Sequence, residues 1–309
     1  MVRWSLRSGV RASVQVAVLI ALGATFSGGV SGPVMFAQEA IVCPEPVAPA
    51  ATAVAAATPE APADPVAFPA EGGDLTVFAA ASLTATFEDI KTDLETANPE
   101  LSITYNFAGS QALVTQLSEG AEADVFASAS RAQMTNAVEA GVIAGDPEVF
   151  TGNRLTIVVP ADNPAGIESA ADLADDGLVL VLAAPEVPVG QYARESACKM
   201  AADTATYGDA FLEGFVGNIV SNEDNVKAVF TKVQLGEADA GIVYTTDVTA
   251  DVAADVLQIE IPADVNVVAT YPIAPVEGGD SALADAFISY VLGPDGQATL
   301  AESGFEPAP

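Results

Sequence analysis

The 309-residue sequence contains no histidine and only two cysteines, Cys43 and Cys198. Histidine is the usual general base for serine or cysteine nucleophiles, so its absence argues against a hydrolase of the common triad type. Histidine and clustered cysteine are also the main transition-metal ligands, and these two cysteines are far apart in the sequence. We therefore expect no catalytic histidine, no transition-metal site and no cofactor.

Positive charge is also scarce, with 10 lysines and arginines against 42 aspartates and glutamates. Three of the basic residues, Arg3, Arg7 and Arg11, lie at the N-terminus. Residues 38–309 keep 7 basic and 42 acidic residues, a formal charge of 7 − 42 = −35. Such a surface repels nucleic acid and is typical of a salt-adapted, strongly hydrated exterior.

The N-terminal region has no apolar run long enough to span a bilayer. Its apolar segment Val14–Leu22 has about half the required length, follows the three arginines and precedes a small residue, Ala37. This pattern predicts a secretory signal over residues 1–37 and an exported protein, either periplasmic or extracellular and cell-surface associated. Val42 before Cys43 disfavours a lipid anchor, because such an anchor calls for a small residue there.

An oxidising compartment permits a disulfide between Cys43 and Cys198, and two free thiols are the alternative. Residues 38–73, where Cys43 lies, are rich in alanine and proline. Prolines at this density prevent a regular helix, so the segment is predicted to be a semi-extended linker.

Alternating strand and helix patterns follow the linker. The segment from Leu75 to Ala81 predicts a buried strand that ends at Ser82, with a helix behind it; Leu101–Phe107 repeats this pattern and is followed by Ser110. We expect Ser82 to be a helix N-cap. Ligands bind outside the carboxyl ends of parallel strands, and helix N-termini favour anions, so both serines are candidate anion donors.

A second α/β block begins near Arg154 and is predicted to be inserted into the first. The pattern predicts strands and closing helices in this order: Leu155–Val159, Leu178–Leu182, Asp239–Tyr244, Val256–Ile261, Tyr271–Pro275, then helices Ser281–Leu292 and Gly296–Glu302. We expect one lobe from residues 74–153 plus 266–309 and a second from residues 154–265. A hinge between two such lobes leaves a cleft at the strand ends.

Four motifs in this order carry a family resemblance: Val77–Leu83, Phe107–Ser110, Ala123–Ala129 and Gly241–Tyr244. Together they resemble the periplasmic molybdate-binding proteins of ABC importers, over about Leu75 to Phe305. The resemblance implies an α/β, two-lobe periplasmic binding protein fold of type II. Each lobe would be a mainly parallel sheet with helices on both faces, and a tetrahedral oxyanion would bind in the cleft.

The resemblance also implies the ligand donors and the partners. Hydroxyl donors fall on Ser82, Ser110 and Tyr244, and backbone donors on Val189, in a Pro-x-Gly turn, and on Val226, at a helix start. The implied cargo is molybdate or tungstate, and the implied partner is an ABC importer permease that receives it from a monomer. Gln111 differs from the serine that some relatives carry after Ser110.

Two alternatives remain at the level of sequence. The same fold binds other oxyanions, and sulfate has the same charge and shape as molybdate with shorter bonds. An exported hydrolase with Ser82 as nucleophile is the alternative from another class. That alternative lacks histidine and a Gly-x-Ser-x-Gly elbow, and its acid/base pair would have to be Glu88 and Asp124.

Overall fold

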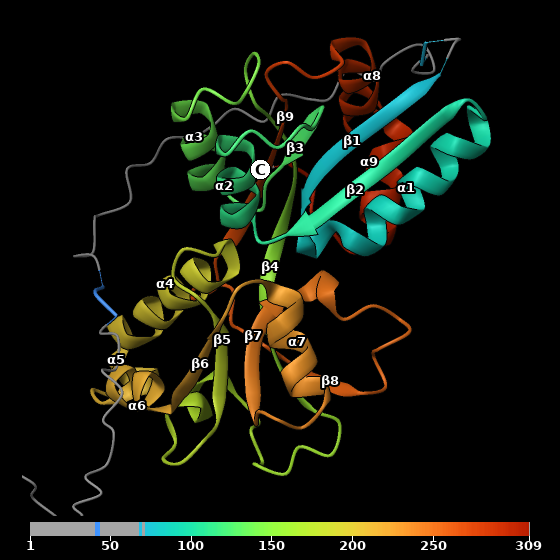
Figure 1. Cartoon of the computed structure of the whole chain (residues 1–309). Helices are drawn as coiled ribbons and strands as arrows, with labels where there is room; N and C mark the ends of the chain where they lie inside the picture. The colour runs from blue at the N-terminus through green and yellow to red at the C-terminus, as the bar shows by residue number, and fades with distance from the viewer. Residues whose placement is uncertain (1–40, 44–67, 70–71, 309) are drawn as a thin grey trace, which may run out of the picture. The chain divides into compact units, whose positions relative to one another are not determined.

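The computed structural model describes residues 41–43, 68–69 and 72–308 (Figure 1). These residues all belong to one compact unit, residues 38–309. The predicted secretory signal lies outside the described residues, as does most of the predicted linker. Within the described part of the chain, no helix is both long and apolar enough to cross a membrane.

The first lobe is built on strands that end near the predicted cleft. β1 pairs in parallel with β2 and β3, and β3 pairs antiparallel with β9, which in turn pairs with β4. The elements of this lobe are β1 (Gly73–Ala80), η1 (Ala81–Leu83), α1 (Thr84–Ala97), β2 (Leu101–Ala108), α2 (Ser110–Ser118), β3 (Val125–Ala127), α3 (Arg131–Glu139), β9 (Val268–Pro275), α8 (Ser281–Leu292) and α9 (Pro294–Glu302).

The second lobe repeats this plan. β5 lies between β6 and β7 and is parallel to both, whereas β4 pairs antiparallel with β7 and β8. Its elements are η2 (Ala170–Ala174), β5 (Leu180–Ala183), α4 (Pro188–Ala202), α5 (Thr204–Tyr207), α6 (Phe211–Asn218), β6 (Ile219–Glu223), α7 (Val226–Gln234), β7 (Ala240–Tyr244), η3 (Thr245–Asp247) and β8 (Val256–Glu260).

Strand β4 (Glu148–Pro160) joins the two lobes. It pairs with β9 up to Arg154 and with β7 from Leu155 onward, so one strand serves both sheets (Figure 1). The two-lobe α/β fold is the one expected from the sequence. The sheets are mixed rather than mainly parallel, because β4 and β9 pair antiparallel with their neighbours. The lobe boundaries remain a prediction, and the change of pairing partner at Arg154 supports them.

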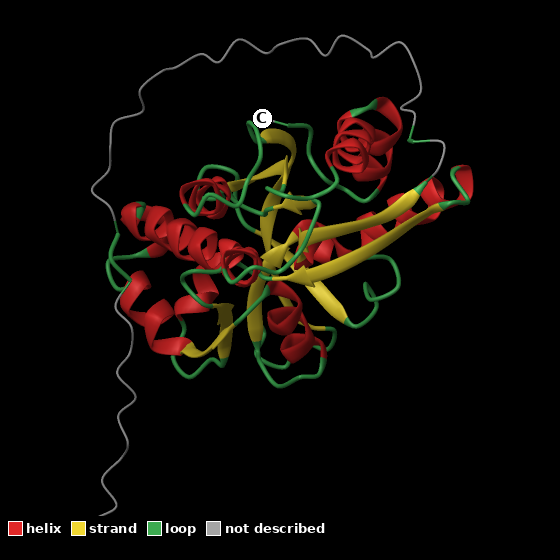
Figure 2. Cartoon of the chain, turned by 45° about the horizontal axis from the view of Figure 1, so that its top comes forward, coloured by secondary structure: helices red, strands yellow, loops and turns green. Residues whose placement is uncertain are grey.

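Helices pack on both sides of the strands (Figure 2). In α1 the residues at helical spacing, Phe87, Ile90 and Leu94, are all buried, as the period of the pattern requires. Phe87 lies edge-on to Phe287 of α8, with ring centroids 5.8 Å apart. Aromatic contacts of this kind stabilise the core beyond the apolar area they bury.

Two local predictions from the sequence are wrong, and two elements were missed. Ser82 is not a helix N-cap: it lies inside η1, and α1 begins after Leu83 without a side-chain cap. Val189 does not lie in a turn, because α4 already begins at Pro188, whose fixed φ suits the first helical position. The strand β6 and the helix α6 were not predicted, because their short apolar runs carry no clear period.

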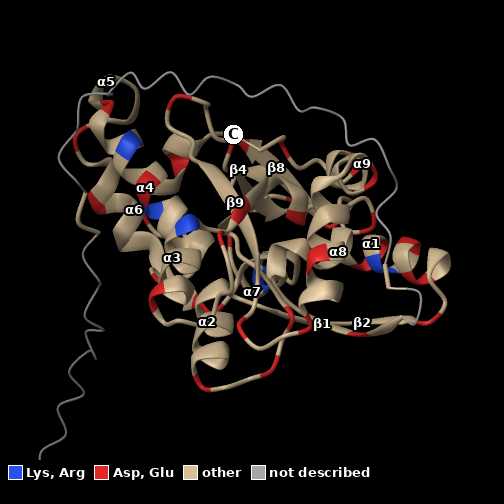
Figure 3. Ribbon diagram, turned by 90° about the horizontal axis from the view of Figure 1, so that it is seen from above, with Lys and Arg blue, Asp and Glu red and all other residues tan. Residues whose placement is uncertain are grey.

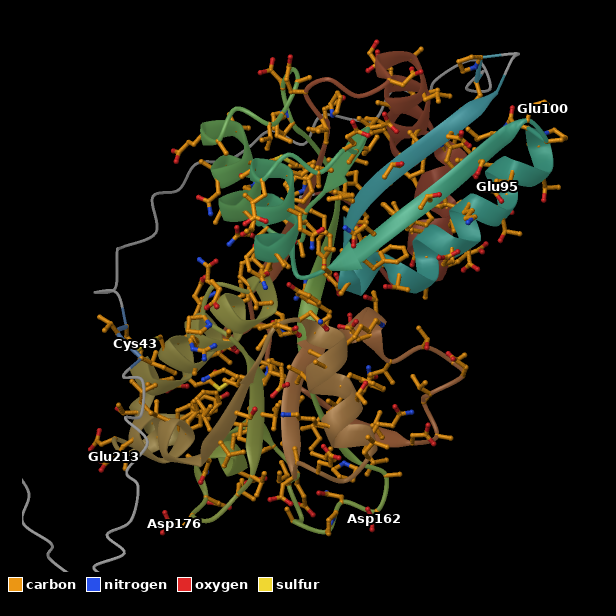
Figure 4. The ribbon with its side chains drawn as sticks, viewed as in Figure 1. Cys43, Glu95, Glu100, Asp162, Asp176 and Glu213 are labelled. Atoms are coloured by element: carbon orange, nitrogen blue, oxygen red, sulfur yellow. A yellow bond between two sulfur atoms is a disulfide. The ribbon has the colours of Figure 1, made fainter. Side chains whose placement is uncertain are left out.

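Cys43 and Cys198 form a disulfide with a Cα–Cα distance of 5.4 Å. The sequence left open either a disulfide or two free thiols, and the structure contains the disulfide. Cys198 belongs to α4, so the bond attaches Cys43 to the second lobe (Figure 4).

Acidic residues are spread over most of the helices and loops, whereas basic residues are few (Figure 3). Most of these cations are paired with a nearby carboxylate, as in Lys91–Glu95, Lys199–Glu195 and Lys232–Glu223. Exposed pairs of this kind contribute little to stability. The excess of negative charge predicted from composition therefore faces solvent.

Candidate functional site

One cavity is lined by the ends of strands and the starts of helices from both lobes. Its volume is about 10 Å³, close to the smallest space that holds one water molecule. Its walls are formed by Ala80, Ala81, Ser82, Ala108, Gly109, Ser110, Ala129, Val187, Pro188, Val189, Val226 and Tyr244. All five residues predicted from the sequence are among them, and each is at most 5% exposed.

The first lobe contributes two serine hydroxyls. Ser82 follows β1 in η1, and its Oγ lies 2.9 Å from the hydroxyl of Tyr271. Ser110 is the first residue of α2, and its Oγ accepts a hydrogen bond from the Ala129 N–H at 3.0 Å. Both hydroxyls are thus held by partners inside the protein rather than by solvent.

Small residues allow the two lobes to approach closely around these serines. A Cβ on Gly109 would lie 2.5 Å from the carbonyl oxygen of Asp224 in the second lobe. Within the second lobe, a Cβ on Gly190 would lie 2.2 Å from the carbonyl oxygen of Ala184, the residue after β5, so glycine lets α4 approach that strand end. Glycine at these two positions therefore lets the helix starts reach the cavity.

The second lobe contributes two helix N-termini. Val189 is the second residue of α4 and Val226 is the first residue of α7. The Asn225 side chain caps α7 by accepting the Ala228 N–H at 3.0 Å. The first N–H groups of a helix have no partner within that helix, and they lie at the positive end of its dipole. Such groups readily bind an anion.

Tyr244, the last residue of β7, adds a phenol that has no partner. It is 1% exposed, and its hydroxyl makes no hydrogen bond with any described residue. Burial raises the pKa of Tyr244 well above its usual value, so the phenol stays protonated. A buried phenol without a partner is costly, and a bound acceptor would satisfy it.

A buried carboxylate fixes the strand end that carries this phenol. Asp247 accepts the Tyr244 N–H at 3.0 Å, and its other oxygen lies 3.2 Å from Lys227 Nζ. Burial raises the pKa of Asp247, and the Lys227 ammonium opposes that shift. Because Lys227 follows Val226, this pair links the end of β7 to the start of α7.

No charged side chain is among the residues that line the cavity. Its donors are three hydroxyls and backbone N–H groups, all of them neutral. Neutral dipoles of this kind can replace the hydration shell of an anion without a formal counter-charge. The arrangement is suited to a small, fully ionised oxyanion.

Three further residues around the cavity were missed at the level of sequence. Tyr271, on β9, is fully buried and contacts Ser82, whereas the sequence indicated only an extended segment there. Gln111 donates to the Asp224 carbonyl at 2.8 Å, and Gln133 donates to the Glu186 carbonyl at 2.9 Å. Both amides join the lobes, and no sequence pattern predicts such long-range contacts.

Two lobes joined by a shared strand, with a donor-lined cavity between them, define the class of two-lobe ligand-binding proteins. The sequence pattern of the bacterial extracellular solute-binding proteins matches residues 75–306, and the chain belongs to that family. The predicted fold and family are thereby confirmed.

Individual relatives refine this comparison. Molybdate-binding protein ModA of Mycobacterium tuberculosis is 40% identical over 246 residues, which cover 79% of this chain and 89% of that protein. A sulfate-binding protein of Synechococcus elongatus is 26% identical over 237 residues, which cover 69% and 66% respectively. The solved periplasmic molybdate-binding protein of Azotobacter vinelandii has a TM-score of 0.60 at 19% identity, over 75% of this chain and 98% of that one, and shares the fold.

Proposed function

We propose that the protein is an exported solute-binding protein that captures molybdate or tungstate and delivers it to an ABC importer. The observation that supports this proposal is that the five residues predicted as neutral donors, from both lobes, all line one cavity. The 40% identity to a molybdate-binding relative supports the choice of ligand, since the sulfate-binding relative is more distant.

In this proposal each donor has a definite role. Ser82, Ser110 and Tyr244 donate hydroxyl protons to the oxyanion, and Val189 and Val226 donate backbone N–H groups. A backbone donor tolerates a change of side chain, so valine is compatible with both positions. Molybdate is the cargo, and the protein needs no cofactor to hold it.

The strongly acidic surface limits how the anion is attracted. A dianion is repelled at long range, but salt screens exposed charges beyond roughly 8–10 Å at moderate ionic strength. Attraction therefore comes from the helix starts and hydroxyls at short range. We expect association to become faster as salt is added, because screening weakens the repulsion before contact.

Calorimetric titration of the mature protein with molybdate, tungstate, sulfate and phosphate tests the proposal. At matched ionic strength we expect tight binding of molybdate and tungstate and none of phosphate, because protonated phosphate needs an acceptor. Ligand at roughly 1,000 times its dissociation constant should stabilise the fold by about 4 kcal/mol. Stronger binding of sulfate than of molybdate would show that the ligand is sulfate, and the protein would still be a solute-binding protein.

The proposal includes no enzymatic activity. Asp124, which the hydrolase alternative would use as an acid or base, accepts the Thr76 N–H at 2.7 Å and the Asp280 N–H at 2.7 Å. Its carboxylate therefore holds a loop of the first lobe together. Turnover of ester or glycoside substrates that is lost in Ser82→Ala would overturn this part of the proposal.

A further inference from the structure

A hydroxyl can both donate and accept a hydrogen bond, so its role in a site depends on where its proton points. A fully ionised oxyanion only accepts. A serine in the cavity therefore helps such a ligand only if its proton is not already donated to another acceptor. In this cavity that depends on the partners of Ser110 and Ser82.

For Ser110 the direction of the bond is fixed. The Ala129 N–H can only donate, and it donates to Ser110 Oγ at 3.0 Å. The Ser110 proton must therefore point elsewhere, and the residue lines the cavity. This serine is set to donate to an anion before the anion arrives.

For Ser82 the partner is another hydroxyl, that of Tyr271, at 2.9 Å, and either oxygen can be the donor. If Ser82 donates, its oxygen presents only lone pairs to the anion, which repels them. If Tyr271 donates, the Ser82 proton is free to enter the cavity. Only the second arrangement suits an oxyanion.

We propose that Tyr271 is a positioning residue that donates its phenol proton to Ser82 and thereby directs the Ser82 proton toward the ligand. This inference rests on the proposed function, because it concerns the same cavity and ligand class. It makes the two serines equivalent: each accepts one bond from the protein and gives its own proton to the anion.

The surroundings of Tyr271 suit this role. The residue is fully buried on β9, and its ring lies edge-on to Phe150 and Phe305, with centroids 6.2 Å and 5.6 Å away. Packing of this kind fixes the ring and so the place of its hydroxyl. Besides Ser82, that hydroxyl is within hydrogen-bonding reach of the Asn153 side chain and of the Tyr244 hydroxyl. Burial also raises the pKa of Tyr271, so its proton is retained.

The Tyr271 hydroxyl should also affect selectivity between fully ionised and protonated oxyanions. With each serine oxygen already accepting one bond, each has one lone pair fewer for the proton of a protonated oxyanion such as hydrogen phosphate. Removal of the Tyr271 hydroxyl would free one acceptor. Tyr271 thus contributes to the rejection of protonated anions without touching the ligand.

A double-mutant cycle on the mature protein tests the inference, with sodium molybdate as the probe in calorimetric titration. Tyr271→Phe keeps the ring and should weaken molybdate binding about three- to tenfold, because the Ser82 hydroxyl regains its three staggered positions and loses polarisation. In the Ser82→Ala background the same change should leave affinity unchanged. The ratio of hydrogen phosphate to molybdate affinity should rise in Tyr271→Phe alone.

Tyr105→Phe is the matched control, because the Tyr105 hydroxyl is also buried but has no hydrogen-bond partner among the described residues. It should change neither affinity nor selectivity. If Tyr271→Phe lowers molybdate affinity equally in the wild-type and Ser82→Ala backgrounds, or in neither, the inference is overturned. The proposed function still stands in that case, provided that the wild type binds molybdate. Absence of oxyanion binding by the wild type would overturn both.

A second measurement applies even if Tyr271→Phe folds poorly. The vibrational difference spectrum of the Tyr244→Phe protein, recorded with and without molybdate, reports the tyrosines whose hydroxyls respond to the ligand. Of these we expect Tyr271, which contacts the cavity serine Ser82, to dominate. We expect the tyrosine C–O stretch to move in the direction of a donating phenol when molybdate binds. A shift in the direction of an accepting phenol would contradict the assignment.

Discussion

At the scale of single residues, the cavity depends on polar groups whose hydrogen bonds are only partly satisfied. Ser82 and Ser110 each have one protein partner, and the Tyr244 hydroxyl has none among the described residues. Partly satisfied buried groups destabilise the empty protein and favour the bound one. Substitution of such a group is therefore expected to change the stability of the empty protein and its affinity for molybdate separately, and both can be measured.

Ser82→Ala and Ser110→Ala should each weaken molybdate binding about ten- to a hundredfold, since each removes a charge-assisted hydrogen bond worth roughly 1.5–3 kcal/mol. Ser110→Ala should also lower the free energy of unfolding by roughly 1–3 kcal/mol, because it leaves the buried Ala129 N–H unpaired. Titration and denaturant melts on the same samples separate the effects. Ser102→Ala, at an exposed position of β2, is the control and should change neither quantity.

Tyr244→Phe should give the opposite pattern of stability. It removes a buried hydroxyl without a partner, so the empty protein should gain up to about 1 kcal/mol, while affinity falls about tenfold. Tyr105→Phe should give a similar gain in stability with affinity unchanged. Thermal melts without ligand, followed by titration, measure both; a loss of stability in Tyr244→Phe would show that its hydroxyl has a partner in the empty protein.

At the scale of elements, the sequence predicted those parts of the site that local patterns determine. Ser82, Ser110 and Val226 follow apolar strands or open periodic helices, so their place at strand ends and helix starts could be read from spacing. The role of Tyr271 could not, because it depends on how β9 packs against a segment 189 residues away. The length of β4 was also missed, since the pairing of its first half with β9 is non-local.

The Asp247–Lys227 pair, which joins β7 to α7, predicts a pH dependence. Because burial raises the pKa of Asp247 in the folded state, the folded protein binds more protons than the unfolded chain above the ordinary aspartate pKa of 3.8. Unfolding then releases protons, so this carboxyl contributes less stability as the pH rises from about 4 through its raised pKa. The stability of wild type relative to Asp247→Asn should therefore fall over that range in denaturant melts. A difference that grows with pH would contradict this account.

Gln111 should act on closure of the lobes, since it reaches from α2 to the Asp224 carbonyl just before α7. Gln111→Ala should weaken molybdate binding by about three- to tenfold, equivalent to one hydrogen bond of about 0.5–1.5 kcal/mol, mostly through faster release. Stopped-flow measurement of release tests this. Gln234→Ala removes an exposed glutamine that bonds Asp255 within the second lobe, and release should be unchanged.

At the scale of the whole molecule, the disulfide closes a sequence separation of 155 residues. In the chain-entropy view, a loop of this size contributes about 5 kcal/mol by restricting the unfolded state. The double variant Cys43→Ser, Cys198→Ser should lose much of that stability and should no longer respond to reductant. Denaturant melts with and without reductant measure it, and equal responses of wild type and variant would show that the bond does not stabilise the fold.

The same bond also constrains the order of events when the chain is made. In a protein threaded N-terminus first through a membrane, Cys43 emerges 155 residues ahead of its partner. Strands β1 to β5 lie between the two cysteines in sequence and emerge before Cys198. In the export that we propose, Cys43 therefore crosses the membrane as a free thiol, before its partner is available. The Cys43–Cys198 bond can form only after Cys198, in α4, has also crossed the membrane.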